Sequence, residues 1–158
     1  MCNPLFVANN IIDRAKQTNI VLTHMKLQKI LYFVYREYIQ KNNKHMPLFA
    51  ERFATWQYGP VLGSVYNVFK KYGSTPITDY YREDGIAYGT NEKDNPLLHE
   101  ILDYIWRQCC GFTGIELANI THKQGSAWYK AFKNDEFFLN DKDILEDTIP
   151  LTLGVCNE

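Results

Sequence analysis

Residues 23–40 read Thr-His-Met-Lys-Leu-Gln-Lys-Ile-Leu-Tyr-Phe-Val-Tyr-Arg-Glu-Tyr-Ile-Gln, and this stretch predicts the strongest helix in the chain. Thr23 suits the N-cap position, where a hydroxyl accepts a hydrogen bond from a backbone N–H of the first turn. The apolar positions that recur at helical spacing are Leu27, Ile30, Leu31, Val34 and Tyr38. The polar positions expected to stay largely in water are Lys26, Lys29, Arg36, Glu37 and Gln40. The stretch therefore predicts an amphipathic helix and favours a helical core.

Other segments carry the same start signals. A polar cap precedes proline at Asn3-Pro4 and at Asn95-Pro96, and proline suits a first helical turn because its missing N–H would be unpaired there anyway. Thr113 and Glu116 have the spacing of a capping box, which predicts a helix that ends near Gly125. The remaining predicted helices are a short one capped by Ser126 and a last turn or two over residues 141–147.

Residues 49–58 read Phe-Ala-Glu-Arg-Phe-Ala-Thr-Trp-Gln-Tyr and lose the helical period. Their β-branched and aromatic residues predict a short strand within 49–58. Gly59-Pro60 is then expected to be a strand-to-helix corner, with a helix that starts at Pro60 and stops at Tyr72-Gly73. A small hairpin is predicted where 77–81 and 86–88 flank a glycine-containing turn.

Length and composition favour one globular domain. The chain has 158 residues, of which 46% are hydrophobic and 22% charged, and no apolar run approaches the ~20 residues of a membrane span. The N-terminus lacks the features of an export signal, which predicts a cytoplasmic protein. We expect a mainly α, compact single-domain bundle of five to seven helices with a minor β element, comprising a domain over 1–140 and a short C-terminal extension, 141–158, packed on it or trailing from it.

The charge balance argues against a general nucleic-acid binder, because the formal net charge is −1 and the pI is about 6.4. A local basic patch remains open, since lysines fall on predicted helices at positions 26, 29, 70 and 71. A nucleic-acid-binding phage regulator is therefore the alternative function, and a solvated helix face explains the same lysines equally well.

No catalytic or metal-binding constellation is evident in the sequence. The four histidines stand at unrelated spacings, and the four cysteines form no C-x-x-C pair. Neither a G-x-x-x-x-G-K-[ST] nor a G-x-G-x-x-G phosphate loop occurs. A hydrolase or transferase that uses His122 rests only on a Thr-His pair before a helix cap. We therefore expect no catalytic residue, no metal and no cofactor.

Aromatic residues are in surplus, with 11 Tyr, 9 Phe and 3 Trp. Tyr and Trp concentrate at the centres of protein interfaces because they supply large contact area and a polar tip at a small entropic cost. The aromatic residues expected in the core are Trp56, Tyr66, Phe69, Trp106 and Trp128. Those expected at the surface are Tyr58, Tyr80, Tyr81 and Tyr129.

Three blocks of sequence together resemble a known family. They are Met25-Lys26-Leu27-Gln28-Lys29-Ile30-Leu31-Tyr32-Phe33, then Trp56-Gln57-Tyr58-Gly59-Pro60-Val61 with Val65-Tyr66, then Leu117 with Ile120-Thr121-His122 and Ser126-Ala127-Trp128. The chain resembles, over about residues 4–132, the Panacea antitoxin-associated domain, a family that is also called SocA-like and includes the phage-associated protein GepA.

The resemblance implies a helical, non-enzymatic domain of phages and mobile elements that neutralises a partner toxin by direct contact or acts as a proteolytic adaptor. It thus suggests a toxin and a AAA+ protease as partners. No membrane partner is expected, because no apolar run is long enough to span one, and a homo-oligomer is left open. The partner-binding candidates are Lys26, Gln28, Lys29, Tyr32, Gln57, Tyr58, His122 and Tyr129. The residues of these motifs and of the capping box that are assigned a structural role are Trp56, Gly59, Pro60, Tyr66, Thr113, Glu116 and Trp128.

Overall fold

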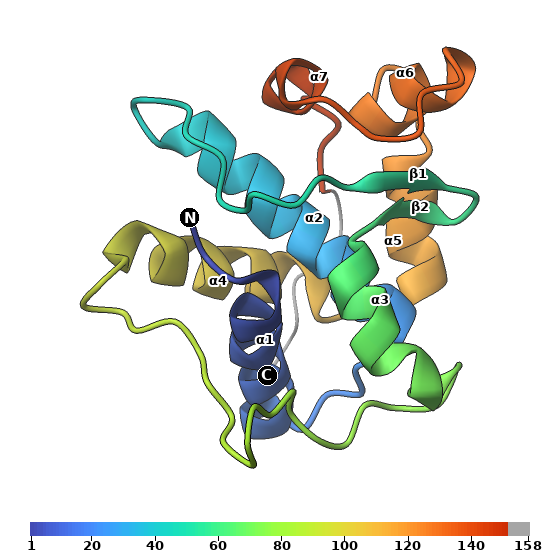
Figure 1. Cartoon of the computed structure of the whole chain (residues 1–158). Helices are drawn as coiled ribbons and strands as arrows, with labels where there is room; N and C mark the ends of the chain where they lie inside the picture. The colour runs from blue at the N-terminus through green and yellow to red at the C-terminus, as the bar shows by residue number, and fades with distance from the viewer. Residues whose placement is uncertain (152–158) are drawn as a thin grey trace.

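The computed structural model describes residues 1–151 and is built around one central helix, α2 (His24–Lys41), which runs through the middle of the molecule (Figure 1). The other helices of the described chain are α1 (Pro4–Thr18), α3 (Gly63–Phe69), the 3₁₀ turn η1 (Lys70–Tyr72), α4 (Pro96–Cys109), α5 (Gly114–Thr121), α6 (Ala127–Lys133) and α7 (Asp141–Glu146). Five of these, α1, α3, α4, α5 and α7, contact α2 directly. The core therefore surrounds α2.

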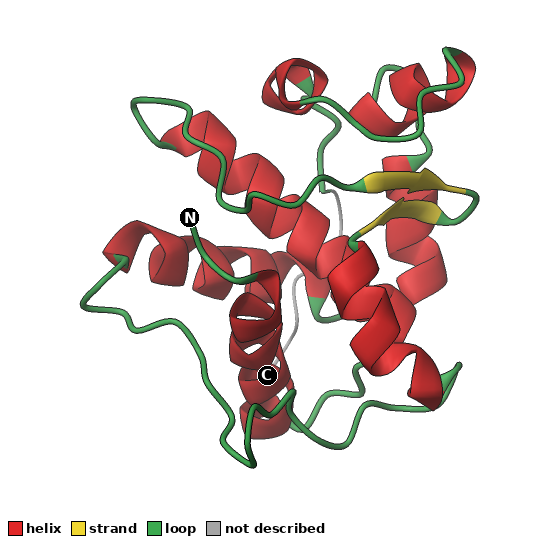
Figure 2. Ribbon diagram, in the orientation of Figure 1, coloured by secondary structure: helices red, strands yellow, loops and turns green. Residues whose placement is uncertain are grey.

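Helices dominate the described residues, and β structure is confined to one hairpin (Figure 2). Its strands are β1 (Ala54–Trp56) and β2 (Gly59–Val61), which pair antiparallel with Thr55 opposite Pro60. The prediction of a mainly α bundle with five to seven helices and a minor β element is confirmed. No helix within residues 1–151 combines the length and the apolar character that crossing a membrane requires.

The predicted helix caps are confirmed by their hydrogen bonds. Each cap side chain accepts a backbone N–H of its own helix; these residues are Asn3, Thr23, Asn95, Thr113 and Ser126. The capping box is reciprocal, because the Glu116 carboxylate also accepts the N–H of Thr113. The expected end of this helix at Gly125 is wrong, since α5 ends at Thr121. There the Ser126 hydroxyl donates to the Thr121 carbonyl and turns the chain into α6.

The cations of α2 were expected in water, and this expectation is wrong for three of them. Lys26, Lys29 and Arg36 are 5%, 1% and 6% exposed. Other elements cover most of α2, and each of these three cations meets an oxygen of another segment. The ammonium of Lys26 donates to the Cys110 carbonyl at 2.7 Å, that of Lys29 to the Pro60 carbonyl at 3.0 Å, and Arg36 pairs with Asp147 at 3.3 Å.

Gly59-Pro60 is not a strand-to-helix corner, which corrects the predicted helix start. Residues 59–61 form β2, and α3 begins at Gly63 with Leu62 as its N-cap. Gly59 has φ +106°, a conformation that favours glycine, and it lets the chain reverse directly after β1. Pro60 then occupies a strand position in which its carbonyl, rather than an N–H, makes the contact with α2.

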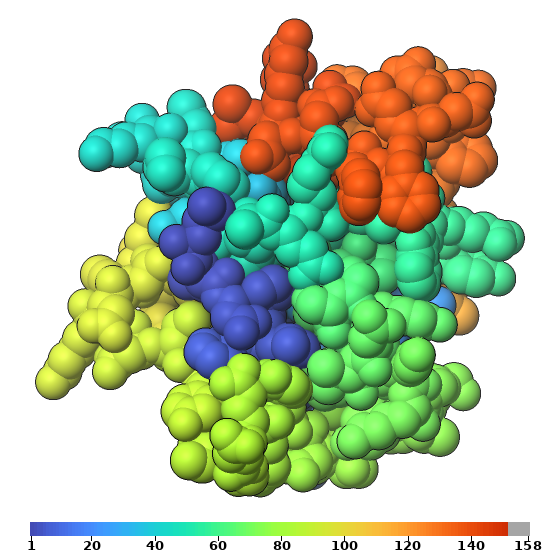
Figure 3. Space-filling view, in the orientation of Figure 1, coloured from blue at the N-terminus to red at the C-terminus, as the bar shows by residue number. Residues whose placement is uncertain are grey.

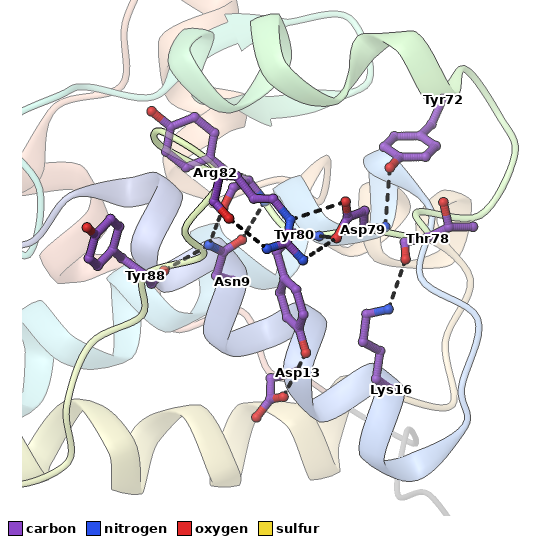
Figure 4. A network of polar contacts seen from close by, with 11 residues as sticks. Asn9, Asp13, Lys16, Tyr72, Thr78, Asp79, Tyr80, Arg82 and Tyr88 are labelled. Atoms are coloured by element: carbon purple, nitrogen blue, oxygen red, sulfur yellow. Dashed lines mark hydrogen bonds and ion pairs between the residues drawn. The ribbon is translucent and has the colours of Figure 1, made fainter.

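The long connection between η1 and α4 also differs from the prediction. Among the described residues of this connection, the only β pairing is a single bridge between Glu83 and Ile86, so the expected hairpin does not form. Instead the segment is tied to α1 (Figure 4), since the buried Asn9 amide donates to the carbonyls of Tyr81 and Tyr88, both at 2.8 Å. These side-chain hydrogen bonds take the place of the bonds between paired strands, because they give the backbone carbonyls a donor without a partner strand.

Asp147 holds the described end of the chain against α2 and α6. Its carboxylate is buried and accepts hydrogen bonds from the Tyr32 hydroxyl at 2.7 Å and from the Ala127 backbone N–H at 3.1 Å, in addition to the Arg36 ion pair. Within the expected extension 141–158, α7 also contacts α2 and α6. Residues 152–158 of this extension lie outside the described part of the chain.

Candidate functional site

A groove of about 270 Å³ opens beside the hairpin, between the first two turns of α2 and the later part of α3 with η1. The residues that line it are His24, Met25, Gln28, Lys29, Trp56, Tyr58, Val61, Tyr66, Lys70 and Gly73. We call this the hairpin groove. Residues of both the first and the second sequence block line the groove, although 30 residues lie between the first residues of the two blocks. Residues of these two motifs therefore lie together and form one surface at this groove.

Gln28 fixes the geometry of the groove by bonding both backbone groups of one residue, Leu62. Its side-chain oxygen accepts the N–H of Leu62 at 2.9 Å, and its side-chain nitrogen donates to the carbonyl of the same residue at 3.1 Å. The amide thus replaces a strand partner at the junction of β2 and α3. Because Gln28 is 2% exposed, its role here is to hold the hairpin on α2.

Lys29 places a buried cation at the base of the groove. Burial lowers the pKa of its ammonium to about 7, because transfer out of water disfavours the charged form. Its Nζ donates to the Pro60 carbonyl, and none of the described residues that line the groove is an Asp or a Glu. Within residues 1–151, the charge therefore has a hydrogen bond but no ion-pair partner.

His24 lies one turn before Gln28 on the same wall. Its Nε2 lies 3.2 Å from the side-chain nitrogen of Gln28, so the ring accepts that hydrogen bond in its neutral form. Burial first, and then the charge of Lys29, lower the pKa of His24 to about 4. The imidazole is therefore neutral at pH 7, and it packs against the Tyr66 ring at a centroid distance of 5.5 Å.

Aromatic rings form the rim of the groove. Trp56 meets Tyr66 edge to face at 4.7 Å, and the Lys70 ammonium lies 5.9 Å from the centroid of the same tyrosine ring. Trp56 was expected in the core, but 37% of it is exposed because its indole packs on the rim. Tyr58, at the turn of the hairpin, is 60% exposed and confirms the expectation of a surface residue.

The third sequence block supports the hairpin from behind. The Trp128 indole N–H donates to the Trp56 carbonyl at 2.8 Å, and the ring packs on His122 at 4.1 Å. Burial, followed by the charge of Lys29, lowers the pKa of His122. A Cβ at Gly59 would lie 2.7 Å from both the Thr121 hydroxyl and Cε of Lys29. All three blocks therefore converge on the hairpin.

A second exposed aromatic cluster adjoins the hairpin and was missed by sequence reasoning. Phe137 and Phe138 are 69% and 38% exposed and pack edge to face. The backbone of this segment pairs with β1, since the Thr55 N–H donates to the Phe137 carbonyl at 2.8 Å. Figure 3 shows this orange segment lying against the hairpin region. Two consecutive phenylalanines are the only hint of this cluster in the sequence, and the sequence does not show that they lie beside Trp56.

The partner-binding candidates fall into two groups in the structure. Gln28, Lys29 and Tyr58 line the hairpin groove, and Gln57 lies exposed in the turn beside it. The candidates outside the groove are Lys26, which bonds Cys110, Tyr32, which is buried on Asp147, His122, which is packed on Trp128, and Tyr129, which is half-buried on α6.

These features define a class of protein. In the described residues, no group of three His, Cys, Asp or Glu side chains could hold a metal ion. The groove offers fixed aromatic rings and one buried cation, which suit recognition of another molecule by contact. A helical domain with a rigid aromatic rim of this kind has the features of a protein-interaction module.

Comparison with known proteins gives the family. Residues 27–129 match the model of the antitoxin SocA-like Panacea domain, and the chain belongs to this family. Antitoxin SocA of Caulobacter vibrioides (strain NA1000 / CB15N) is 27% identical over 126 residues, which cover 77% of this chain and 66% of that antitoxin. The alignment thus spans just under two thirds of that relative's length. No solved structure shows a significant match. The resemblance expected from the three blocks is confirmed.

Proposed function

We propose that this protein is an antitoxin that neutralises a protein toxin by direct contact at the hairpin groove. The single observation that carries the proposal is that all three sequence blocks of the family converge on this hairpin. Gln28 and Trp128 hold the backbone of the hairpin through hydrogen bonds, and the Trp56 ring is packed edge to face on Tyr66. A backbone and a ring that are already positioned lose little entropy on docking, which favours affinity.

The rim supplies the contacts in this proposal. Tyr58 and Trp56 present apolar area together with a hydroxyl or an indole, and Phe137 and Phe138 extend the same apolar surface past β1. Aromatic anchors of this kind carry much of the energy of protein interfaces. The protein acts in this role without catalysis, in the cytoplasm, and it requires no cofactor.

A nucleic-acid-binding regulator has less support than a protein-binding module. Two of the four lysines that motivated it, Lys26 and Lys29, are buried and bonded to carbonyls. Phosphate contacts require cations at the surface. A catalytic role for His122 likewise gains no support, since its ring packs on Trp128 and no described residue hydrogen-bonds its buried Nε2.

Co-expression with the products of neighbouring genes tests the proposal. We expect one of them to arrest growth alone, and this protein to restore growth and to be retained with that product in a pull-down. Tyr58→Ala should weaken the complex by at least about tenfold while leaving the melting temperature unchanged, because the ring is exposed. Tyr104→Ala, on the exposed side of α4, is the matched control and should bind normally.

The outcome that contradicts the proposal is retention of no protein partner, or a Tyr58→Ala variant that protects as well as the native chain. A proteolytic-adaptor role is separated by following the toxin after synthesis is stopped. An adaptor shortens the lifetime of the toxin in a manner that depends on a AAA+ protease, whereas simple neutralisation leaves the amount of toxin unchanged.

A further inference from the structure

Lys29 is a buried cation without a counter-charge in the described part of the chain. It is 1% exposed, its ammonium donates to the Pro60 carbonyl, and it lines the hairpin groove. An ammonium has three N–H donors, so one carbonyl satisfies only part of its capacity. Buried charges in proteins are normally paired. A lysine left in this state suggests that its partner charge comes from another molecule.

The charges around the groove have one sign. Lys70 stands on the rim, and the charge of Lys29 acts on both His24 and His122. The described residues that line the groove include no carboxylate. Apart from the Gln28 amide, mostly aromatic and apolar residues form the remaining walls, so the groove combines the buried ammonium with a largely apolar lining. This pattern is complementary to a carboxylate carried on a short apolar stem.

We propose that the hairpin groove receives an Asp or Glu side chain of the partner protein, whose carboxylate pairs with the ammonium of Lys29 while its stem packs between Trp56, Tyr58 and Tyr66. This inference rests on the proposed function, because it names the chemistry of the contact at the same site. A volume of about 270 Å³ accommodates such a side chain. Nucleic acid fits less well, because its phosphates track a surface, whereas Lys29 is 1% exposed.

Small probes test the site without the toxin. We expect 3-phenylpropionate, followed by NMR of the labelled protein, to bind saturably at the groove, and the neutral 3-phenylpropanamide to bind at least roughly tenfold more weakly. Lys29→Met should remove this preference, because methionine keeps the length of the side chain without its charge. Lys93→Met, on an exposed loop, is the matched control and should keep it. Phenyl phosphate should bind no more tightly than the carboxylate.

The pH dependence is a second readout in the native protein. Carboxylate binding needs the protonated lysine, and burial lowers the pKa of Lys29 to about 7. Affinity should therefore be greatest near about pH 6, where the probe is still a carboxylate, and fall by up to about tenfold per pH unit above pH 7. The other basic groups near Lys29 are His24 from α2, His122 from the end of α5 and Lys70 from η1. The pKa of His24 is lowered to about 4, so its imidazole stays neutral in this range, and burial also lowers the pKa of His122.

Several results overturn the inference. They are equal binding of acid and amide by the native protein, tighter binding of phenyl phosphate, and a Lys29→Met variant that binds the toxin as well as the native chain does. If Lys29→Met fails to fold, the Cε shift of Lys29 in the native protein decides, since only the acid should move it. A toxin that binds independently of Lys29 leaves the proposed function standing. A carboxylate-selective groove with no protein partner refutes the proposed function instead.

In the complex itself, one Asp→Asn or Glu→Gln substitution in the toxin should weaken binding as much as Lys29→Met does. Combining the two substitutions should weaken binding little further, because both remove the same contact. Additive losses for every acidic residue of the toxin would contradict the pairing.

Discussion

Among the residues of the groove, Lys29 lowers the stability of the folded protein most, because its ammonium is buried. Its pKa is about 7 in the folded protein and near 10.5 as a free side chain. Between these values the unfolded chain binds more protons than the folded chain, so the free energy of unfolding rises with pH. The folded state is thus penalised most at neutral and acidic pH, where the ammonium is charged and buried.

We expect Lys29→Met to be at least as stable as the native protein at pH 7 and to lack the rise in stability between pH 7 and pH 10. The native chain should gain up to about 1.4 kcal/mol per pH unit from this residue. Urea titrations at three pH values measure the difference, with Lys93→Met as the control that keeps the native slope. If the free energy of unfolding depended on pH in the same way for the native and Lys29→Met proteins, burial would not lower the pKa of Lys29 in solution.

Gly59 is the second residue on which the site depends. Both Gly59 and Gly85 have positive φ, +106° and +81°, but only Gly59 is crowded, since a Cβ there would lie 2.7 Å from Lys29 and Thr121. Gly59→Ala should therefore lower the free energy of unfolding by roughly 1–3 kcal/mol more than Gly85→Ala does. Thermal and urea unfolding of the two variants test this. Equal losses would mean that only backbone strain acts at Gly59.

At the scale of elements, Asp147 joins three parts of the chain. It binds Tyr32 and Arg36 of α2 and the first N–H of α6, and it follows directly after α7. Removing its charge leaves the buried Arg36 guanidinium without its ion-pair partner, and breaking one side of a buried pair is strongly destabilising.

Asp147→Asn should therefore lower the free energy of unfolding by about 3–5 kcal/mol. The control is Asp103→Asn, because Asp103 also pairs with an arginine, Arg14, but is 63% exposed. That change should stay within about 0.5 kcal/mol. Urea unfolding measures both variants. A small loss for Asp147→Asn would mean that the residues around Arg36 rearrange to supply another acceptor.

At the scale of the whole molecule, burial is highest along α2 and lowest in the connection between η1 and α4. Most residues of α2 are buried, whereas most of residues 73–95 are exposed and, apart from one bridge, hold no helix or strand. Local opening requires little free energy where few apolar contacts are lost. We expect amide hydrogens of α2 to exchange slowest, near the rate set by global unfolding, and those of 73–95 fastest. Uniform exchange across both segments would contradict a core organised around α2.

The sequence alone determined where most helices lie, their predicted caps and the family, but not that α3 begins at Gly63 or that α5 ends at Thr121. The cap residue Thr113 and its partner Glu116 are three residues apart, and an apolar stripe repeats every three or four residues. Both patterns are local and can therefore be recognised in the sequence. The tertiary structure decided which face of α2 meets water, where Gly59 turns the chain and where the groove opens. Lys29 and Pro60 are 31 positions apart, and Tyr32 and Asp147 are 115 apart. Whether a lysine is solvated or buried depends on what packs over it, and that is set by such distant contacts, for which local sequence carries no signal.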